Sequence, residues 1–425
     1  MRIVVENGEF DVRDARISVI NTSNLRRIDW FMALVVMALV LCGWLALYSA
    51  SQYSTGGYFA RQMLAVLIGV AVAATIIVVD YRFVVLFAPV LYVGAVGALA
   101  AVLAFGHTAK GSERWLQLGP IGIQPSEVTK LIMVYFLAWY LNLLGDRIKK
   151  FHWFALTFIL TAVPMYLILK QPNLGTAMCL GPLVVVMLFV AGCKWRHLAL
   201  VVACSLALVP VLVWQMKDFD PVKFKEDRKR GTVAKTLAAS SEAATEDDAK
   251  PKGILAKLHL KDYQKMRIYA FLHPEEDKSD SGWQTYQSLI TVGSGGLSGK
   301  GYMQGTQTKL KWLPEQHTDF IFSVVAEEVG FIGASIIIGL FAAFLLRGLM
   351  FARDCPDLTG TLLATGIVTV LGFHIFVNIA ITLGLMPVTG IPLPFLSYGR
   401  SFYITTMMCV GVLMNIPMRR KLFVN

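Results

Sequence analysis

Four acidic side chains stand within six positions in the second half of the chain; they are Glu275, Glu276, Asp277 and Asp280. A carboxylate in such a run can take a proton from a reacting hydroxyl group. Trp283 and Tyr286 follow closely, and their rings offer flat apolar faces on which a sugar can stack. A solvated turn is the alternative interpretation of the acids, and the aromatic neighbours favour a site.

A glycine-rich run, GSGGLSGKG, extends from Gly293 to Gly301. Its spacing fits neither the phosphate loop of nucleotide hydrolases nor the dinucleotide-binding motif. Glycine permits close approach of another backbone, or a nest of amides that holds an anion, and Lys300 and Lys309 add positive charge nearby. The run is therefore either an anion-holding loop or a flexible turn at a membrane surface.

Charged side chains also interrupt long apolar runs, where they are costly and usually serve a function. Glu127 and Lys130 are three residues apart, so in a helix they share a face and can neutralise each other. An ion pair that only holds helices together is an equal alternative for these two. Glu327 and Glu328 are adjacent, and we expect at least one of them to face a polar cavity.

His374 and Asn378 are four residues apart on one face of another apolar run. A single histidine in such a place is typical of a packed hydrogen-bonding residue, since a metal site needs further ligands. The last connection, from Met386 to Ser401, has three prolines among apolar residues, which indicates a rigid re-entrant segment.

The composition shows which environment must hold these groups. The chain has 425 residues, of which 56% are hydrophobic and 16% charged, and its mean hydropathy is +0.60. A soluble domain averages about 25% charged residues, so soluble, disordered, collagen-like and disulfide-stapled proteins are excluded and an integral membrane protein is indicated. The net charge of +11 fits Lys and Arg in cytoplasmic loops and gives no argument for nucleic acid as a partner. The six cysteines have no zinc-binding or redox spacing and are interpreted as small core residues.

The fold class predicted is an all-α polytopic membrane protein with about ten transmembrane helices. Ten apolar runs are long enough to cross a bilayer of about 30 Å. They lie at 30–50, 60–79, 84–105, 125–144, 153–169, 174–192, 197–216, 320–346, 359–385 and 401–417. The first run has no cleavage site after it, so we expect a retained anchor rather than a signal peptide.

The Lys and Arg bias of the short connections predicts that both termini are cytoplasmic. Residues 1–28 are then a cytoplasmic tail, 29–216 hold the first seven helices, 319–417 hold the last three, and 418–425 form a second cytoplasmic tail. The same parity makes 217–318 one long extracytoplasmic loop between the seventh and eighth helices. Within it, 225–252 has the composition of a disordered insert, and 263–318 carries the residues that could form a site.

Five stretches of this chain resemble the SEDS proteins (shape, elongation, division and sporulation), from the first span to the last. The stretches are GSERWLQLGPIGIQPSEVTK (111–130), QPNLGTA (171–177), the GW-x-x-x-QS step (282–288), LPEQHTDFIFSVVAEEVG (313–330) and MPVTGIPLPFLSYG (386–399). The run GSGGLSGKGYMQGTQ (293–307) is more similar to the elongation branch, RodA, than to the division branch, FtsW.

This resemblance implies a peptidoglycan glycosyltransferase that polymerises lipid II at the outer face of a bacterial inner membrane during elongation and shape maintenance. It implies a class B penicillin-binding protein as partner and a divalent cation, Mg²⁺ or Mn²⁺, although no ligand set is legible in the sequence. The family's essential carboxylate falls on Asp277. The residues expected to bind substrate are Arg61, Arg114, Glu127, Lys130, Gln287, Ser288, Lys300, His317, Glu327, Glu328 and Ser397.

The chain departs from the usual family pattern at Asn173, Lys278 and Arg400, which stand where Asp, Pro and Gly are usual. Three alternatives remain open at this point. One is a flippase or transporter of a lipid-linked precursor, in which the intramembrane charges would form a pathway. The others are the septal homologue of the same family and a scaffold without activity.

Overall fold

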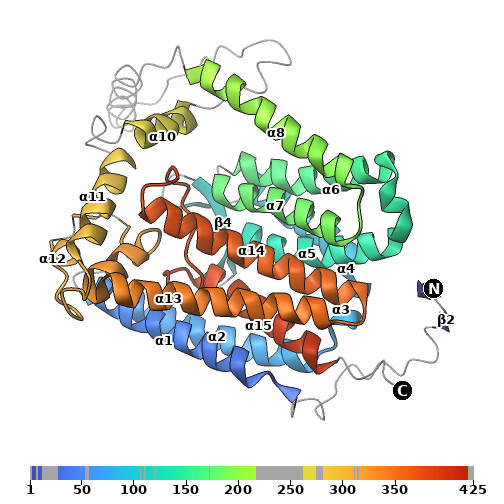
Figure 1. The fold of residues 1–425 in the computed structure, drawn as a ribbon, viewed down its shortest axis with the longest axis horizontal. Coiled ribbons are helices and arrows are strands. Elements are labelled where there is room, and N and C mark those ends of the chain that lie inside the picture. Colours follow the sequence, from blue (N-terminus) through green and yellow to red (C-terminus); the bar gives the residue numbers. More distant parts are fainter. Residues whose placement is uncertain are drawn as a thin grey trace.

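Helices account for most of the described chain (Figure 1). The computed structural model describes residues 2–5, 8–11, 27–52, 57–105, 107–109, 112–118, 121–171, 173–216, 262–273, 281–310, 312–313 and 315–419. The charged insert 225–252 and the acidic run from Glu275 to Asp280 lie outside these residues, so the expected disorder and the expected carboxylate site stay predictions.

Each of the ten predicted spans coincides with a helix. These helices are α1 (Trp30–Gln52), α2 (Tyr58–Val78), α4 (Ala88–Phe105), α5 (Pro125–Leu144), α6 (Phe151–Lys170), α7 (Leu174–Val190), α8 (Trp195–Met216), α13 (Ile321–Asp354), α14 (Leu358–Thr382) and α15 (Arg400–Met418). Eight of them are long and apolar enough to cross a membrane, and α7 and the first part of α8 are shorter apolar helices. The predicted class of polytopic helical membrane protein is confirmed.

Shorter elements cap the bundle. Helices α10 (Asp262–Leu272), α11 (Ser281–Ser294) and α12 (Thr306–Lys309) gather at the end of the bundle where α13 begins (Figure 1). Helix α3 (Tyr81–Leu86) and the 3₁₀ turn η2 (Gly145–Lys149) join neighbouring helices. The domain boundaries proposed from the sequence are not tested further by these elements.

Five short strands accompany the helices, a feature that the apolar runs do not predict. Strands β1 (Arg2–Val5) and β2 (Gly8–Asp11) form a hairpin, and β3 (His107–Ala109), β4 (Ser112–Leu118) and β5 (Ile121–Ile123) form an antiparallel sheet. The second sheet lies in the connection between α4 and α5, where Leu116 pairs with Ile123. It carries the first half of the 111–130 motif to the start of α5.

Helices α2 and α15 approach closely through small residues. A Cβ atom at Gly411 of α15 would touch the backbone of Ala73, and one at Gly69 of α2 would touch Met407. Small residues at helix interfaces let backbones come together when lipid and protein are equally apolar. This packing fixes α15, and with it the segment that precedes α15.

That segment, 386–399, has no regular structure and is mostly buried. That it is a re-entrant segment stays a prediction. Its backbone polar groups are bonded by side chains from neighbouring elements. Asn378 Nδ2 donates to the carbonyl of Ile391 at 2.7 Å, and the Ser397 hydroxyl accepts from the amide of Leu393 at 2.7 Å. The same hydroxyl donates to the carbonyl of Thr318 at 2.5 Å. These bonds satisfy polar groups of a buried backbone that has no helix or strand to pair them.

Candidate functional site

Glu127 and Lys130 form the buried ion pair that their spacing predicts. Helix α5 begins at Pro125, which suits a first helical turn because proline has no amide hydrogen to leave unpaired. Lys130 Nζ donates to Glu127 Oε2 at 2.7 Å, and the two residues are only 1% and 4% exposed. A charge this buried must be neutralised locally, and each partner does this for the other.

Two other helices complete this polar cluster. Lys130 Nζ lies 2.7 Å from Nε2 of His374 on α14, and the Thr176 hydroxyl on α7 donates to Glu127 Oε1 at 3.3 Å. The ring of Phe402 on α15 lies 5.2 Å from the same ammonium, which adds a cation–π contact. Residues from four helices therefore meet at one buried charge pair.

Asn173 occupies the place where the family usually has aspartate, beside this cluster. Its Oδ1 accepts from the amide of Thr176 at 3.3 Å, so it caps α7. Its Nδ2 donates to the hydroxyl of Ser126 at 3.2 Å. The amide thus both starts α7 and ties it to α5.

Glu327 is the second buried carboxylate, fully buried near the start of α13. Lys300 Nζ donates to Glu327 Oε1 at 2.8 Å. The carboxylate also accepts from the amide of Gln307 at 2.9 Å and from the hydroxyl of Thr308 at 3.0 Å. It therefore holds the connection between α11 and α13 against the helix. The polar cavity expected beside one of the two adjacent glutamates stays a prediction.

The ammonium of Lys300 uses all three of its hydrogen-bond donors in this cluster. An ammonium has three donors. In Lys300 they reach the hydroxyl of Ser294 at 2.8 Å, that of Thr306 at 2.7 Å and Glu327. This arrangement favours a structural role for Lys300 in the conformation described.

The glycine-rich run packs against a break in α13. Gly330 has φ 66° and ψ −168°, so the helical ladder is interrupted there. The amides of Phe331 and Ile332 donate to the carbonyls of Gly296 and Leu297 at 2.9 and 3.1 Å. In return, the amides of Lys300 and Gly301 donate to the carbonyls of Glu327 and Glu328 at 3.0 Å each. Residues 293–301 thus form a strap, whose backbone supplies hydrogen-bond partners to the amides and carbonyls that the break in α13 leaves unpaired.

Glycine is required in this strap because the two backbones touch. A Cβ atom at Gly295 would clash with the carbonyl of Ala326, and one at Gly299 would clash with that of Glu328. Gly299 also has φ 82°, a conformation that favours glycine. The structure displays the close backbone approach that glycine permits, and a role in holding an anion stays a prediction.

Gln287, Ser288 and Glu328 anchor the same end of the bundle. Gln287 on α11 donates to Gln307 at 2.5 Å. The Ser288 hydroxyl lies 2.8 Å from that of Ser323 and donates to the carbonyl of Thr382 at 2.8 Å. Glu328 accepts from the hydroxyl of Ser49 on α1. The side chain of Gln287 and that of Ser288 are buried, so in this conformation they position α11 against α13 and α14.

His317 and Ser397 lie together near the end of the segment 386–399. The His317 ring stacks on Tyr58 of α2 with centroids 4.1 Å apart, and its carbonyl accepts from the amide of Tyr398 at 2.8 Å. Ser397 bonds the backbone of Thr318, next to His317. The two predicted residues therefore form a third cluster, built from α2, the connection before α13 and the connection after α14.

Three predicted residues stand apart from these clusters. Arg61 is exposed on the first turn of α2. Arg114 lies on β4, and its side chain is outside the described residues, as is Asp277 altogether. The described structure does not bring these three into one site.

Sequence reasoning missed the partners that come from remote elements. Ser49, Thr176 and Gln307 contact Glu328, Glu127 and Glu327. Thr176 and Gln307 lie in stretches that resemble the family, which could have singled them out, whereas nothing in the local sequence marks Ser49. His374 was interpreted as a packed hydrogen-bonding residue, and its contact with Lys130 agrees with that interpretation.

The described residues do not fit a divalent cation. Among them, no three side chains of His, Cys, Asp or Glu lie close enough together to hold a metal ion. The carboxylates of Glu127 and Glu327 already accept hydrogen bonds from protein donors.

Comparison with known families covers almost the whole chain. The sequence model of the FtsW, RodA and SpoVE group, described as cell cycle proteins, matches residues 29–245 and 249–422. The chain belongs to this family. The matched residues contain all ten apolar helices and each of the clusters above.

The relatives that are similar to the chain include proteins named for the division branch and proteins named for the elongation branch. A probable peptidoglycan glycosyltransferase FtsW of Geobacter sulfurreducens is 34% identical over 95% of this chain and 98% of its own. The peptidoglycan glycosyltransferase RodA of Treponema pallidum is 34% identical over 92% of this chain and 98% of its own. The peptidoglycan glycosyltransferase MrdB of Escherichia coli is 32% identical over 93% of this chain and 95% of its own. These identities do not separate the branches, so assignment to RodA stays a prediction.

Solved structures of the family share the fold. One, described as "Structural coordination of polymerization and crosslinking by a peptidoglycan synthase complex", is 30% identical with a TM-score of 0.73 and covers 93% of this chain and 98% of its own. A crystal structure of the Thermus thermophilus rod shape determining protein RodA is 28% identical with a TM-score of 0.63 over the same shares.

Proposed function

We propose that the chain is a peptidoglycan glycosyltransferase that polymerises lipid II at the outer face of the bacterial cytoplasmic membrane. The observation that carries this proposal is its similarity, at 32–34% identity over more than nine tenths of its length, to relatives named for that activity. The buried clusters around Lys130 and Glu327 support it, because they give the bundle a rigid polar interior at the end that carries the predicted loop.

The reaction joins a sugar hydroxyl of the acceptor to the anomeric carbon of the donor. The bond from that carbon to the undecaprenyl pyrophosphate breaks, and the transition state resembles an oxocarbenium ion, as in glycoside hydrolysis. Asp277 is proposed as the base that takes the hydroxyl proton, a step that contributes about 10² to 10⁴-fold.

The departing pyrophosphate needs positive charge near it. Arg61 is exposed at the start of α2 and is free of the tight packing that surrounds Lys130. We therefore propose Arg61, together with Arg114, as the groups that bind the pyrophosphate. Lys130 then stabilises the interior through Glu127 and His374 rather than touching substrate.

The finer assignments belong to the same proposal. Both termini are placed in the cytoplasm and residues 217–318 outside it, with an elongation role and a class B penicillin-binding protein as partner. A relative's structure in a synthase complex that polymerises and crosslinks supports such a partner. A divalent cation is also proposed; its ligands would have to include residues beyond those described, such as the acidic run.

Polymerisation of lipid II by the purified chain tests the proposal. Wild type should make long glycan, and Asp277→Asn should make none while it still folds and binds lipid II, since asparagine keeps the shape of aspartate but is not a base. Glu275→Gln, Glu276→Gln and Asp280→Asn are the matched controls and should retain activity.

Two outcomes would contradict the proposal. Polymerisation by Asp277→Asn at the wild-type rate would remove this residue from catalysis. Failure of wild type to make glycan, with movement of lipid II across vesicles instead, would favour the transporter. Repeating the assay with EDTA and restored Mg²⁺ or Mn²⁺ tests the cation separately.

A further inference from the structure

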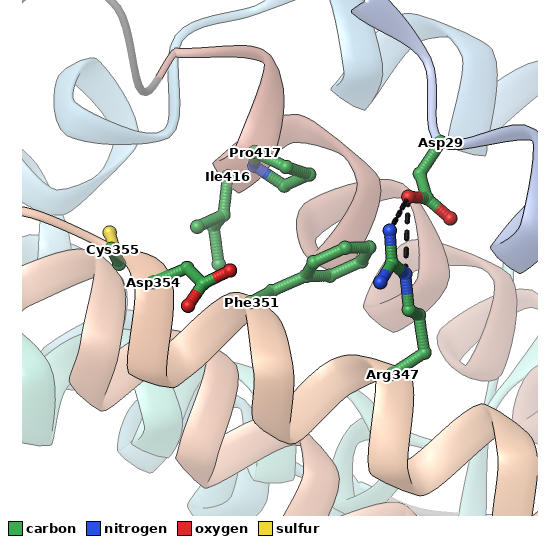
Figure 2. A pocket seen from close by; sticks show the side chains of 7 residues that line it. All are labelled: Asp29, Arg347, Phe351, Asp354, Cys355, Ile416 and Pro417. Carbon is green, nitrogen blue, oxygen red and sulfur yellow. Dashed lines mark hydrogen bonds and ion pairs between the residues drawn. The ribbon is translucent and has the colours of Figure 1, made fainter.

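A small cavity with both charged and apolar lining lies at the other end of the bundle from α10–α12. It is lined by residues that precede α1, end α13 and end α15, namely Asp29, Arg347, Phe351, Asp354, Cys355, Ile416 and Pro417 (Figure 2). Its volume is about 90 Å³. None of these residues takes part in the clusters described above, and the proposed function leaves them without a role.

Asp29 and Arg347 form one wall of this cavity. Asp29 accepts from the amide of Met32 at 2.8 Å, so it caps α1, and it accepts from Arg347 Nε at 3.1 Å and from Nη2 (Figure 2). The Asp29 pKa lies below its ordinary value: burial opposes ionisation, but the hydrogen bonds from Arg347 and Met32 outweigh it. The carboxylate is therefore charged at neutral pH.

An apolar groove lies next to the cavity and shares one lining residue, Arg347, with it. It is lined by Phe31, Ala343, Leu346, Met350 and again Arg347, and its volume is about 440 Å³. The groove lies between α1 and α13. Arg347, which is 35% exposed, is the wall that cavity and groove share.

The depth of this site in the membrane follows from its neighbours. Trp30 and Phe31 at the start of α1 are 70% and 53% exposed, which is typical of aromatic residues at a membrane interface. The groove therefore lies at the level of acyl chains and the cavity at the level of headgroups. A ligand that fills both must be an amphiphile.

The charges of the lining decide which amphiphile fits. Arg347 donates to Asp29 through Nε and Nη2, and its Nη1 has only the weak acceptor Met350 Sδ at 3.7 Å. This remaining edge of the guanidinium lines the groove and could bind the phosphate of a lipid. The cavity beyond it has two carboxylates, Asp29 and Asp354, and Arg353 pairs with the second at 3.1 Å. A headgroup with phosphate followed by an amine matches this order of charges.

We propose that the groove and cavity bind one aminophospholipid, with an acyl chain between α1 and α13, its phosphate at Arg347 and its primary ammonium at Asp29 and Asp354. Phosphatidylethanolamine has this chemistry. Phosphatidylcholine has no N–H to donate to the carboxylates, and phosphatidylglycerol places no cation between them, so both should bind more weakly.

Binding of defined lipids to the purified, delipidated full chain tests the proposal. Native mass spectrometry with dioleoyl phosphatidylethanolamine, phosphatidylcholine and phosphatidylglycerol should show at least about tenfold preference for the first, a difference of about 1.4 kcal/mol. Asp354→Asn should reduce that preference to about threefold or less, since it removes one carboxylate and leaves the Asp29–Arg347 pair in place. Asp146→Asn, an exposed acid on η2, is the matched control and should change nothing.

A second variant tests the groove without altering any charge. Ala343→Phe fills the groove and should weaken all three lipids about tenfold or more; size-exclusion chromatography shows whether it folds. Equal binding of the three lipids, preference for phosphatidylglycerol, or an unchanged preference in Asp354→Asn would each overturn the proposal. Glycan synthesis is not the readout, so this result is independent of the proposed function.

Discussion

The ammonium of Lys130 on α5 and the Nε2 atom of His374 on α14 lie 2.7 Å apart, although 244 residues separate them. An ammonium only donates, so Nε2 accepts and a neutral His374 carries its proton on Nδ1. With Glu127 on the other side, Lys130 is held between two acceptors from two helices. A charge pair predicted within one helix is therefore also a contact between helices.

Breaking the Glu127–Lys130 pair should be costly. Glu127→Gln or Lys130→Met alone leaves a buried charge without its partner, which typically costs about 3–5 kcal/mol. The double variant should lose less than the sum of the single losses, as a double-mutant cycle of unfolding in detergent would show. The exposed Asp146–Lys149 pair has the same spacing and should show no measurable coupling. Additivity at the buried pair would argue against direct coupling.

His374 should stabilise the chain through its accepting nitrogen. His374→Leu removes the acceptor and leaves one Lys130 donor unpaired, at a cost of about 1–3 kcal/mol. His374→Gln keeps an acceptor and should recover part of that loss. The melting temperatures of the two variants decide the matter, and a leucine variant as stable as the glutamine variant would assign His374 to packing alone.

Alanine should leave the stability of the chain nearly unchanged at one glycine of the glycine-rich run and lower it at another. Gly299→Ala meets the Glu328 carbonyl in a conformation with positive φ, so it should destabilise by about 1–3 kcal/mol. Gly293→Ala, at the end of α11, meets open space and should be neutral or stabilise by up to about 1 kcal/mol. Hydrogen exchange of residues 296–301 provides the second readout, and faster exchange is expected only in Gly299→Ala.

Topology can be tested at a position outside the described residues. Cysteine introduced as Ser240→Cys should react with an impermeant thiol reagent in cells whose outer envelope has been removed, because the Lys and Arg bias places 217–318 outside. The parent chain, with its six native cysteines, measures the background. Cys355, in the connection between α13 and α14, should add little to it, because burial raises the pKa of its thiol to about 12. Labelling of Ser240→Cys only after lysis would reverse the predicted orientation.

The sequence alone determined the number and approximate limits of the apolar helices, because a run of about 20 apolar residues has few alternatives to crossing a membrane. It also determined the Glu127–Lys130 pair, since residues three apart in a helix are neighbours. Both conclusions depend on local chain geometry.

Only the tertiary structure decided which helices surround each buried polar group. Apolar residues cover the spans on nearly every side, so their pattern does not say which face meets His374, Ser49 or the glycine-rich run. That choice follows from the cost of leaving a charge or a backbone amide without a partner in an apolar medium. The break at Gly330 is held by residues 296–301, and the charge of Lys130, which Glu127 of the same helix already neutralises, finds a second acceptor on α14; both contacts come from distant parts of the chain.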